Sequence, residues 1–207
     1  MKSATLRRSI SLLILGGLLV LPGAAWAQIS GTSHDLSYLA ASGEICIYCH
    51  TPHNADATVT DAPLWNHELT TQTFTMYSSG TLDGVISGQP TGVSLLCLSC
   101  HDGVTALDSF GGVTRTTLMS GTFVLGTDLA NDHPISLTYV DGMDAGLYDP
   151  TTTASGLGGN IDADLLFGAS NDQLECASCH DVHDDSNGTF LRMANTGSAL
   201  CLTCHNK

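Results

Sequence analysis

Apolar residues follow no long regular period in this chain, except in one run near its start. Residues 10–21 are mostly apolar, three basic residues precede them, and residues 25–27 (Ala-Trp-Ala) fit the small-x-small pattern of a cleavage site. A basic start, a short apolar run and such a site are typical of a secretory signal peptide. We therefore expect residues 1–27 to be removed and the mature domain, residues 28–207, to begin at Gln28.

The same run bears on membrane association. It is shorter than the stretch of about 20 apolar residues that spans a bilayer, and no later stretch approaches that length. We therefore expect no retained transmembrane helix and an exported protein.

The mature part is rich in Gly, Thr and Ser and shows little amphipathic helical periodicity. Strand-like fragments at 122–125 and 135–140 are brief and bounded by turn residues. Short helices are predicted at four places. Their predicted caps are Ser42, Ser94 and Ser198, with a capping box at Asp172 and Glu175. The pattern predicts a mostly irregular, loop-rich fold with short α-helices and few short strands.

Each predicted helix carries the same unit, Cys-x-x-Cys-His, and the four copies use all eight cysteines. The cysteines are Cys46, Cys49, Cys97, Cys100, Cys176, Cys179, Cys201 and Cys204, and the histidines are His50, His101, His180 and His205. Two thiols at this spacing lie one helical turn apart and form thioethers to the two vinyl groups of one haem, whose iron the adjacent histidine ligates as proximal ligand. The sequence therefore predicts four covalently bound haem c groups.

Other cysteine chemistry explains the pattern less well. Eight cysteines in an exported protein could form four disulfides, and paired Cys-x-x-Cys units could bind zinc or iron–sulfur clusters. None of these accounts for a histidine after every second cysteine. Haem attachment therefore remains the preferred interpretation.

The four units form an internal repeat. Units one and three read CxxCHxxH, whereas units two and four follow Ser-Leu-Leu and Ser-Ala-Leu. A haem pair is thus written twice, at 42–101 and 172–205. With about 45 residues per haem, little polypeptide remains for an ordinary core, so we expect the haems to form much of it.

Five further histidines are available as second axial ligands. They are His34, His53, His67, His133 and His183. Four haem irons in an electron carrier need four such distal ligands. We therefore expect four of the five to ligate iron.

Two of these histidines follow a proximal histidine by three residues. His53 cannot easily ligate the iron held by His50, because the two ligands must approach from opposite faces of the macrocycle. The same holds for His183 relative to His180, so both are expected to ligate neighbouring haems and tie the haems into close pairs. The predicted pairs are His53 with the His101 haem and His183 with the His205 haem, which leaves His34, His67 and His133 for the haems of His50 and His180.

The charge balance limits the possible partners. Without residues 1–27, three basic residues face 20 acidic ones, before any haem propionate is counted. Such a surface argues against nucleic acid or an anionic membrane as partner. It permits cationic partners or metal ions, although a solubilising acidic surface explains it equally well.

Several segments resemble a known family. They are Cys-His-Thr-Pro-His-Asn-Ala at 49–55, Leu-Trp-Asn-His at 64–67, Leu-Leu-Cys-Leu-Ser-Cys-His-Asp-Gly at 95–103, Asn-Asp-His-Pro-Ile at 131–135, Cys-Ala-Ser-Cys-His-Asp-Val-His at 176–183 and Leu-Cys-Leu-Thr-Cys-His at 200–205. Together they resemble the multihaem cytochromes of metal-respiring bacteria with doubled CxxCH units, and among these the OmcE-type tetrahaem cytochromes.

The resemblance implies a tetrahaem cytochrome c organised around a stacked chain of bis-histidine haems. It also implies secretion to the cell surface and head-to-tail polymerisation into an extracellular filament, in which one histidine can ligate a haem of the next subunit. The implied partners are other copies of this chain, redox-partner cytochromes and extracellular acceptors such as metal oxides.

We therefore expect an electron-transfer protein and not an enzyme. A monomeric shuttle in the periplasm or at the outer surface is the alternative. A multihaem reductase would need an open coordination site, whereas the motifs are regular and distal histidines are in surplus. A membrane quinol-oxidising cytochrome would keep its N-terminal helix.

The N-terminal arm offers a candidate for ligation between subunits. His34 precedes the first haem cysteine on a segment that can reach outward. It is the first candidate for donation to a neighbouring haem, with His67 and His133 as contenders. The alternative is that His34 ligates the His50 haem of its own chain.

Overall fold

The computed structural model describes residues 28–39, 43–139 and 144–207. The expected signal peptide and Ser42 lie outside the described residues. In chain order the elements are η1 (Ser37–Leu39), η2 (Cys46–Tyr48), β1 (Val85–Ile86), α1 (Gly92–His101), β2 (Leu137–Thr138), α2 (Ile161–Leu165), β3 (Gln173–Leu174), α3 (Cys176–Cys179), η3 (Thr196–Ser198) and α4 (Ala199–Cys204), where η marks a 3-10 helix. Loops connect these short elements throughout, as the sequence pattern predicts.

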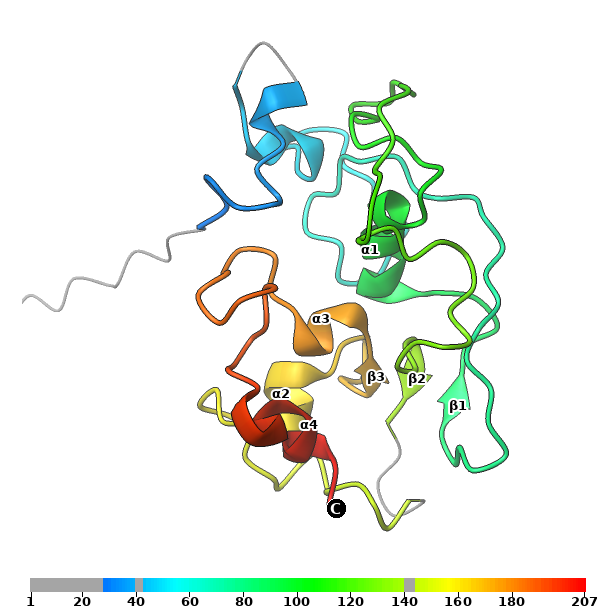
Figure 1. Cartoon of the computed structure of the whole chain (residues 1–207), viewed down its shortest axis with the longest axis vertical. Helices are drawn as coiled ribbons and strands as arrows, with labels where there is room; N and C mark the ends of the chain where they lie inside the picture. The colour runs from blue at the N-terminus through cyan, green and yellow to red at the C-terminus, as the bar shows by residue number, and fades with distance from the viewer. Residues whose placement is uncertain (1–27, 40–42, 140–143) are drawn as a thin grey trace, which may run out of the picture.

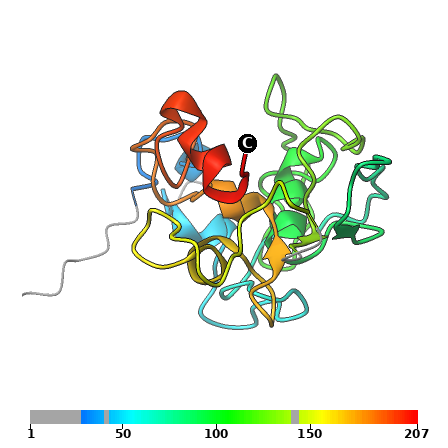
Figure 2. The same ribbon diagram turned by 90° about the horizontal axis from the view of Figure 1, so that it is seen from below.

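The helices that carry cysteines lie close together. Both views of the ribbon show α3 between α1 and α4 (Figures 1 and 2). The three strands form one antiparallel sheet in the order β1-β2-β3, with Ile86 opposite Leu137 and Leu137 opposite Leu174. The sheet joins segments that are far apart in the sequence and so connects the two halves of the chain.

The strand prediction is half correct. The fragment at 135–140 contains β2. The fragment at 122–125 is wrong, because it forms a turn in which the N–H of Val124 donates to the carbonyl of Gly121 at 3.3 Å. Phe123 in this turn is 64 % exposed, so no neighbouring strand covers it.

Two of the predicted caps are wrong. Helix α1 begins at Gly92 with Thr91 as N-cap, and Ser94 is a fully buried residue of its first turn. The Ser94 hydroxyl instead accepts the backbone N–H of Cys176 at 2.9 Å. The capping box of α3 also lies three residues later than predicted: Glu175 is the N-cap, and its N–H donates to the Ser178 hydroxyl at 2.9 Å. Both hydroxyls therefore hold the start of α3.

The prediction for α4 is correct in position only. Ser198 is the N-cap, but its side chain makes no capping hydrogen bond. The N–H of Leu200 donates instead to the Asn195 side-chain oxygen at 3.1 Å. An asparagine three residues earlier thus satisfies one of the free donors at the helix start.

The apolar core is small and divided. One cluster consists of Leu137, Tyr139, Ile161, Leu165, Leu166 and Leu174, and a second of Phe74, Leu98 and Leu129. Large apolar side chains next to the CxxCH units remain exposed, among them Leu64, Phe123, Val182 and Leu202. Burial of apolar surface is the main favourable term in folding, so an apolar group that covered these side chains would stabilise the protein.

A buried carboxylate joins α1 to α3. Glu175 is only 3 % exposed and accepts hydroxyl hydrogen bonds from Thr91 and Ser136, both at 3.2 Å. Gly92 has a φ of +49°, and a Cβ there would lie 2.8 Å from the Glu175 Oε1 atom. Removal from water raises the pKa of Glu175, although the hydroxyl donors oppose that effect. The junction therefore depends on a close fit around one acidic side chain.

Candidate functional site

The four CxxCH units share one backbone geometry. Each forms a helical turn, and the histidine that follows three of them donates its backbone N–H to the carbonyl of the first cysteine. These bonds are His50 to Cys46 at 2.9 Å, His180 to Cys176 at 3.1 Å and His205 to Cys201 at 2.9 Å. The remaining unit, unit two at residues 97–101, lies entirely within α1. The predicted short helices at the motifs are therefore present, the first as a 3-10 turn.

In three units the chain loops back to the motif after the histidine, and this returning segment fixes the histidine ring. The Nδ1 atoms of His50, His101 and His180 lie at backbone carbonyl oxygens. The partners are Pro63 at 2.7 Å, Phe123 at 2.8 Å and Thr189 at 2.9 Å, respectively. A metal-ligating histidine usually donates its second ring N–H to such an acceptor, which sets the tautomer and leaves Nε2 for the metal. The three rings are therefore held as proximal ligands are.

The first and third units repeat this arrangement residue by residue. Leu64 and Phe190, which follow the two carbonyl acceptors, have φ values of +54° and +57°. Two residues further on, the backbone N–H groups of Asn66 and Arg192 donate to the second cysteine of each motif at 2.9 Å. The structural repeat thus extends beyond the cysteines and histidines.

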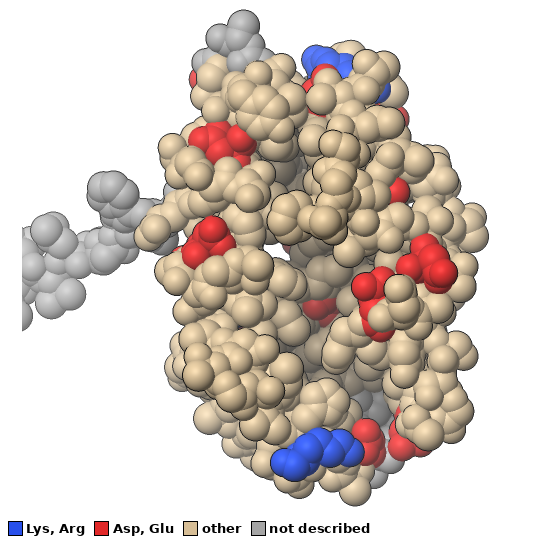
Figure 3. Space-filling model, in the orientation of Figure 1, with Lys and Arg blue, Asp and Glu red and all other residues tan. Residues whose placement is uncertain are grey.

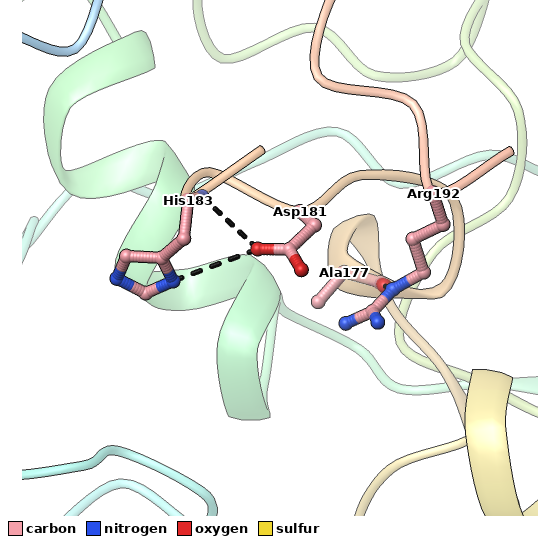
Figure 4. Close-up of polar contacts among 4 residues, drawn as sticks. All are labelled: Ala177, Asp181, His183 and Arg192. Atoms are coloured by element: carbon pink, nitrogen blue, oxygen red, sulfur yellow. Dashed lines mark hydrogen bonds and ion pairs between the residues drawn. The ribbon is translucent and has the colours of Figure 1, made fainter. Parts of the chain in front are cut away.

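Asn66 and Arg192 also act through their side chains. Asn66 donates to the carbonyl of Ile47 and Arg192 to that of Ala177, which are the residues after the first cysteine of each motif. Figure 4 shows the Arg192 side chain beside Ala177. Sequence reasoning missed both residues, because an asparagine and an arginine after loops of different length carry no common signal. Each closes one haem-attachment turn from the returning segment.

All eight cysteines lie among the described residues, and no disulfide joins any of them. Burial raises the pKa of Cys49 to about 11 and that of Cys204 to about 11. The thiol of Cys97 donates to Cys176, which raises the pKa of Cys97 and lowers that of Cys176. The thiols of units two and three are therefore in contact.

The other neighbouring units also approach through their cysteines. Burial raises the pKa of Cys100, and the nearby Cys49 adds to this effect. Burial likewise raises the pKa of Cys179, with Cys201 as the next contribution. Each CxxCH unit thus has a cysteine near a cysteine of the next unit along the chain.

Three of the motif histidines face a second histidine. The ring centroids are 6.0 Å apart for His50 and His183, 6.2 Å for His101 and His34, and 6.3 Å for His205 and His133. A metal–imidazole bond is about 2.0 Å, so two such bonds on opposite sides of one metal ion place the ring centroids about 6 Å apart. Each pair therefore has the separation of two axial ligands.

These ring pairs differ from the expected ones. His183 faces His50 and not His205, and His101 faces His34 and not His53. The loop after α3 turns back toward the first unit, where the N–H of Gln28 donates to the carbonyl of His183 at 2.8 Å. This long-range contact has no signature in the spacing of histidines.

His34 packs inside its own chain and does not extend outward on the arm. Its ring meets Phe190 edge-on at 4.4 Å, and its Nδ1 atom is buried without a hydrogen-bond partner among the described residues. Burial, together with the nearby His101, lowers the pKa of His34 to about 4. The ring is therefore neutral near pH 7, which is the form that binds metal.

His53 and His67 lie apart from these pairs. Both line a cavity of about 490 Å³. His53 is exposed, whereas His67 is 3 % exposed with its Nε2 3.0 Å from the Ala106 carbonyl oxygen and its Nδ1 2.8 Å from that of Glu68. Within the part of the chain that the structure describes, neither makes a ring contact with His180, which faces no other histidine.

The residues present fit covalent haem. The thiol pairs would hold the vinyl carbons, the motif histidines and the facing histidines would ligate iron, and the exposed apolar side chains of Leu64, Phe123, Val182 and Leu202 would cover the macrocycle. Haem supplies one-electron redox chemistry. Across the described residues, no group of three His, Cys, Asp or Glu side chains is placed to hold a metal ion.

The comparison with protein families agrees with this chemistry. A family described as "Doubled CXXCH motif" matches residues 169–207, which contain the third and fourth units. No curated protein matches the chain. The doubled-motif domain and the four CxxCH units indicate a multihaem c-type cytochrome that transfers electrons. The individual attachment and ligand residues stay predictions.

Most of the surface in Figure 3 is uncharged. On this face acidic side chains are scattered, whereas the few basic ones lie near the two ends of the long axis. Within the described ranges, no helix has both the length and the apolar character that crossing a membrane requires.

Proposed function

We propose that this protein is a tetrahaem cytochrome that carries electrons along a line of bis-histidine haems as the subunit of an extracellular filament. It is not an enzyme. The observation that carries the electron-transfer proposal is the facing of His50, His101 and His205 by three other histidines at 6.0–6.3 Å between ring centroids.

Two axial imidazoles leave no coordination site for a substrate. His50 and His183, for example, would hold one haem iron, and the haem would supply one-electron redox chemistry there without exchange of a ligand. Six-coordinate iron therefore suits electron transfer better than catalysis. Electron transfer also needs closely spaced haems, and the neighbouring cysteines of successive units support such spacing: Cys49 with Cys100, Cys97 with Cys176 and Cys179 with Cys201.

The filament proposal rests on the family resemblance and on one unmatched histidine. His180 faces no histidine in the described part of its own chain, while His53 is exposed. Both ring nitrogens of His67 already lie at carbonyl oxygens. We therefore assign His53 as the sixth ligand of the His180 haem in a neighbouring copy. His53 is preferred to His34 and His133 for this role, since each of the latter two lies beside a motif histidine of its own chain.

The acidic composition supports the expected surroundings. Residues 28–207 contain 20 acidic and three basic residues, and this negative balance favours cationic or metal-containing acceptors over nucleic acid. An exported chain of this kind works at the cell surface, with the periplasm as the alternative, and exchanges electrons with partner cytochromes and with extracellular acceptors such as metal oxides.

Mass spectrometry and electron paramagnetic resonance (EPR) test the proposal. The intact mass of the mature protein should show four haem additions. In the isolated subunit about a quarter of the haem should be high-spin, and it should become low-spin on assembly. Fewer than four additions would contradict the haem count, and an all-low-spin subunit would contradict donation between copies.

Two variants test the donor. His53→Ala should prevent filament formation in electron micrographs without raising the high-spin fraction of the isolated subunit. His67→Ala is the matched control and should still assemble. The reverse result would transfer the donor role to His67.

A reductase is the second candidate, because His180 without a facing histidine would give an open iron. It predicts that nitrite or carbon monoxide binds to one haem of the native, assembled material. Absence of any such spectral change would leave electron transfer as the function.

A further inference from the structure

Four of the six histidines in the facing pairs have the Nδ1 atom beside an acceptor, which is either a backbone carbonyl or a carboxylate. The Nδ1 atoms of His50, His101 and His133 lie at neutral backbone carbonyls, at 2.7, 2.8 and 3.0 Å. The Nδ1 of His183 lies instead 3.5 Å from the Oδ1 of Asp181. Among the described residues, His183 is the one histidine of the three facing pairs with a carboxylate at this position.

The position of Asp181 is set by its own loop. Its backbone N–H donates to the carbonyl of Phe190 at 2.7 Å, and its Oδ1 accepts the backbone N–H of His183 at 3.0 Å. Figure 4 shows the same oxygen directed at the His183 ring. Arg192 lies in the same region but donates to Ala177, and no ion pair joins it to Asp181 in the described structure. The carboxylate therefore stays beside the imidazole, in a partly exposed position where the two side chains are 37 % and 43 % exposed.

We propose that Asp181 tunes the haem iron held between His50 and His183 and gives it the lowest reduction potential of the three facing pairs. This inference rests on the proposed axial role of that pair. A carboxylate at Nδ1 makes an imidazole a stronger donor to its metal, whereas a neutral carbonyl does so less. Its negative charge also favours the oxidised iron, which carries one more positive charge than the reduced iron.

Asp181 is a positioning and tuning residue, since it acts through His183.

The test compares two single-charge variants of the holoprotein. Asp181→Asn removes the charge but keeps an oxygen acceptor for the ring and the backbone N–H of His183. Asp184→Asn is the control, because it removes the same charge from the same loop, where Asp184 accepts the N–H of Ser186 at 2.8 Å. Spectroelectrochemical titration should show the most negative haem component shifted to higher potential in Asp181→Asn and nearly unchanged in Asp184→Asn. EPR should show a changed low-spin signal for one haem only.

Equal titration curves for the two variants, with all paired haems still low-spin, would overturn the inference and leave the proposed function intact. Asp181→Ala separates charge from geometry, because it also removes the acceptor for the His183 backbone. A shift in Asp181→Ala without one in Asp181→Asn would assign the effect to loop position and likewise overturn the electrostatic role.

Discussion

The imidazole rings of His50 and His183 face each other at 6.0 Å between centroids, with only 19° between their planes, although they come from opposite halves of the chain. The first histidine ends the first CxxCH unit, and the second lies three residues beyond the third. An iron bound between them would therefore cross-link units one and three. Folding and haem binding should be strongly coupled in this protein.

His183→Ala should leave one haem with a single protein ligand. Because His183 is the ring that faces His50, the high-spin fraction of the isolated subunit should rise by about a quarter of the total haem. EPR of the oxidised protein measures this fraction. The matched control is His53→Ala, which lies at the same offset from its motif but should leave the isolated subunit unchanged. An equal rise in both variants would contradict the ring pairing.

His34→Ala should also produce high-spin haem in the isolated subunit. If His34 instead lay on an outward arm and ligated a neighbouring haem, the isolated subunit would keep its wild-type spectrum. The reason is that His34 is buried against Phe190 and faces His101 within one chain. Optical and EPR spectra of unassembled protein provide the measurement. Wild-type spectra combined with failure to form filaments would instead restore the arm as an intersubunit donor.

Arg192→Ala should destabilise the third haem unit through the loss of its hydrogen bond to the Ala177 carbonyl. A hydrogen bond to a charged donor contributes about 1.5–3 kcal/mol to the free energy of unfolding. Denaturant titration followed by the haem Soret band should show that loss. Arg115→Ala is the control, since Arg115 donates to exposed loop carbonyls, and it should cost clearly less. Equal losses would mean that Arg192 acts only through its charge.

Glu175→Gln should change how stability depends on pH. Burial raises the pKa of Glu175 above its ordinary value of 4.5, so the folded protein holds this proton more tightly than the unfolded chain. Its contribution to stability is therefore full below that ordinary value and declines as pH rises through the raised one. The stability of the wild type relative to Glu175→Gln should fall from acidic to neutral pH, as measured by unfolding at a series of pH values. A relative stability that rises over this range would show that the hydroxyl donors of Thr91 and Ser136 dominate and lower the pKa.

Local chemistry made much of this protein predictable. A Cys-x-x-Cys-His unit needs only one helical turn, and the backbone N–H of His50 bonds to Cys46 within that turn. The loop-rich fold and the short strand at Leu137 also follow from the composition and the short apolar fragments. These features depend on neighbours in sequence, so the sequence alone determined them.

Contacts between distant segments could not be predicted in this way. Ser94 reads as a helix cap, yet its hydroxyl is taken by the N–H of Cys176, because α1 and α3 pack end against end. The choice of distal histidine is of the same kind. His34 and His183 each lie near other candidates in sequence, and only the return of the loop after α3 toward residue 28 brings them to His101 and His50. The sequence thus determined which residues are predicted to attach haem, whereas the tertiary structure decided which rings face one another, because ring pairing depends on where loops close in space and not on the spacing of histidines along the chain.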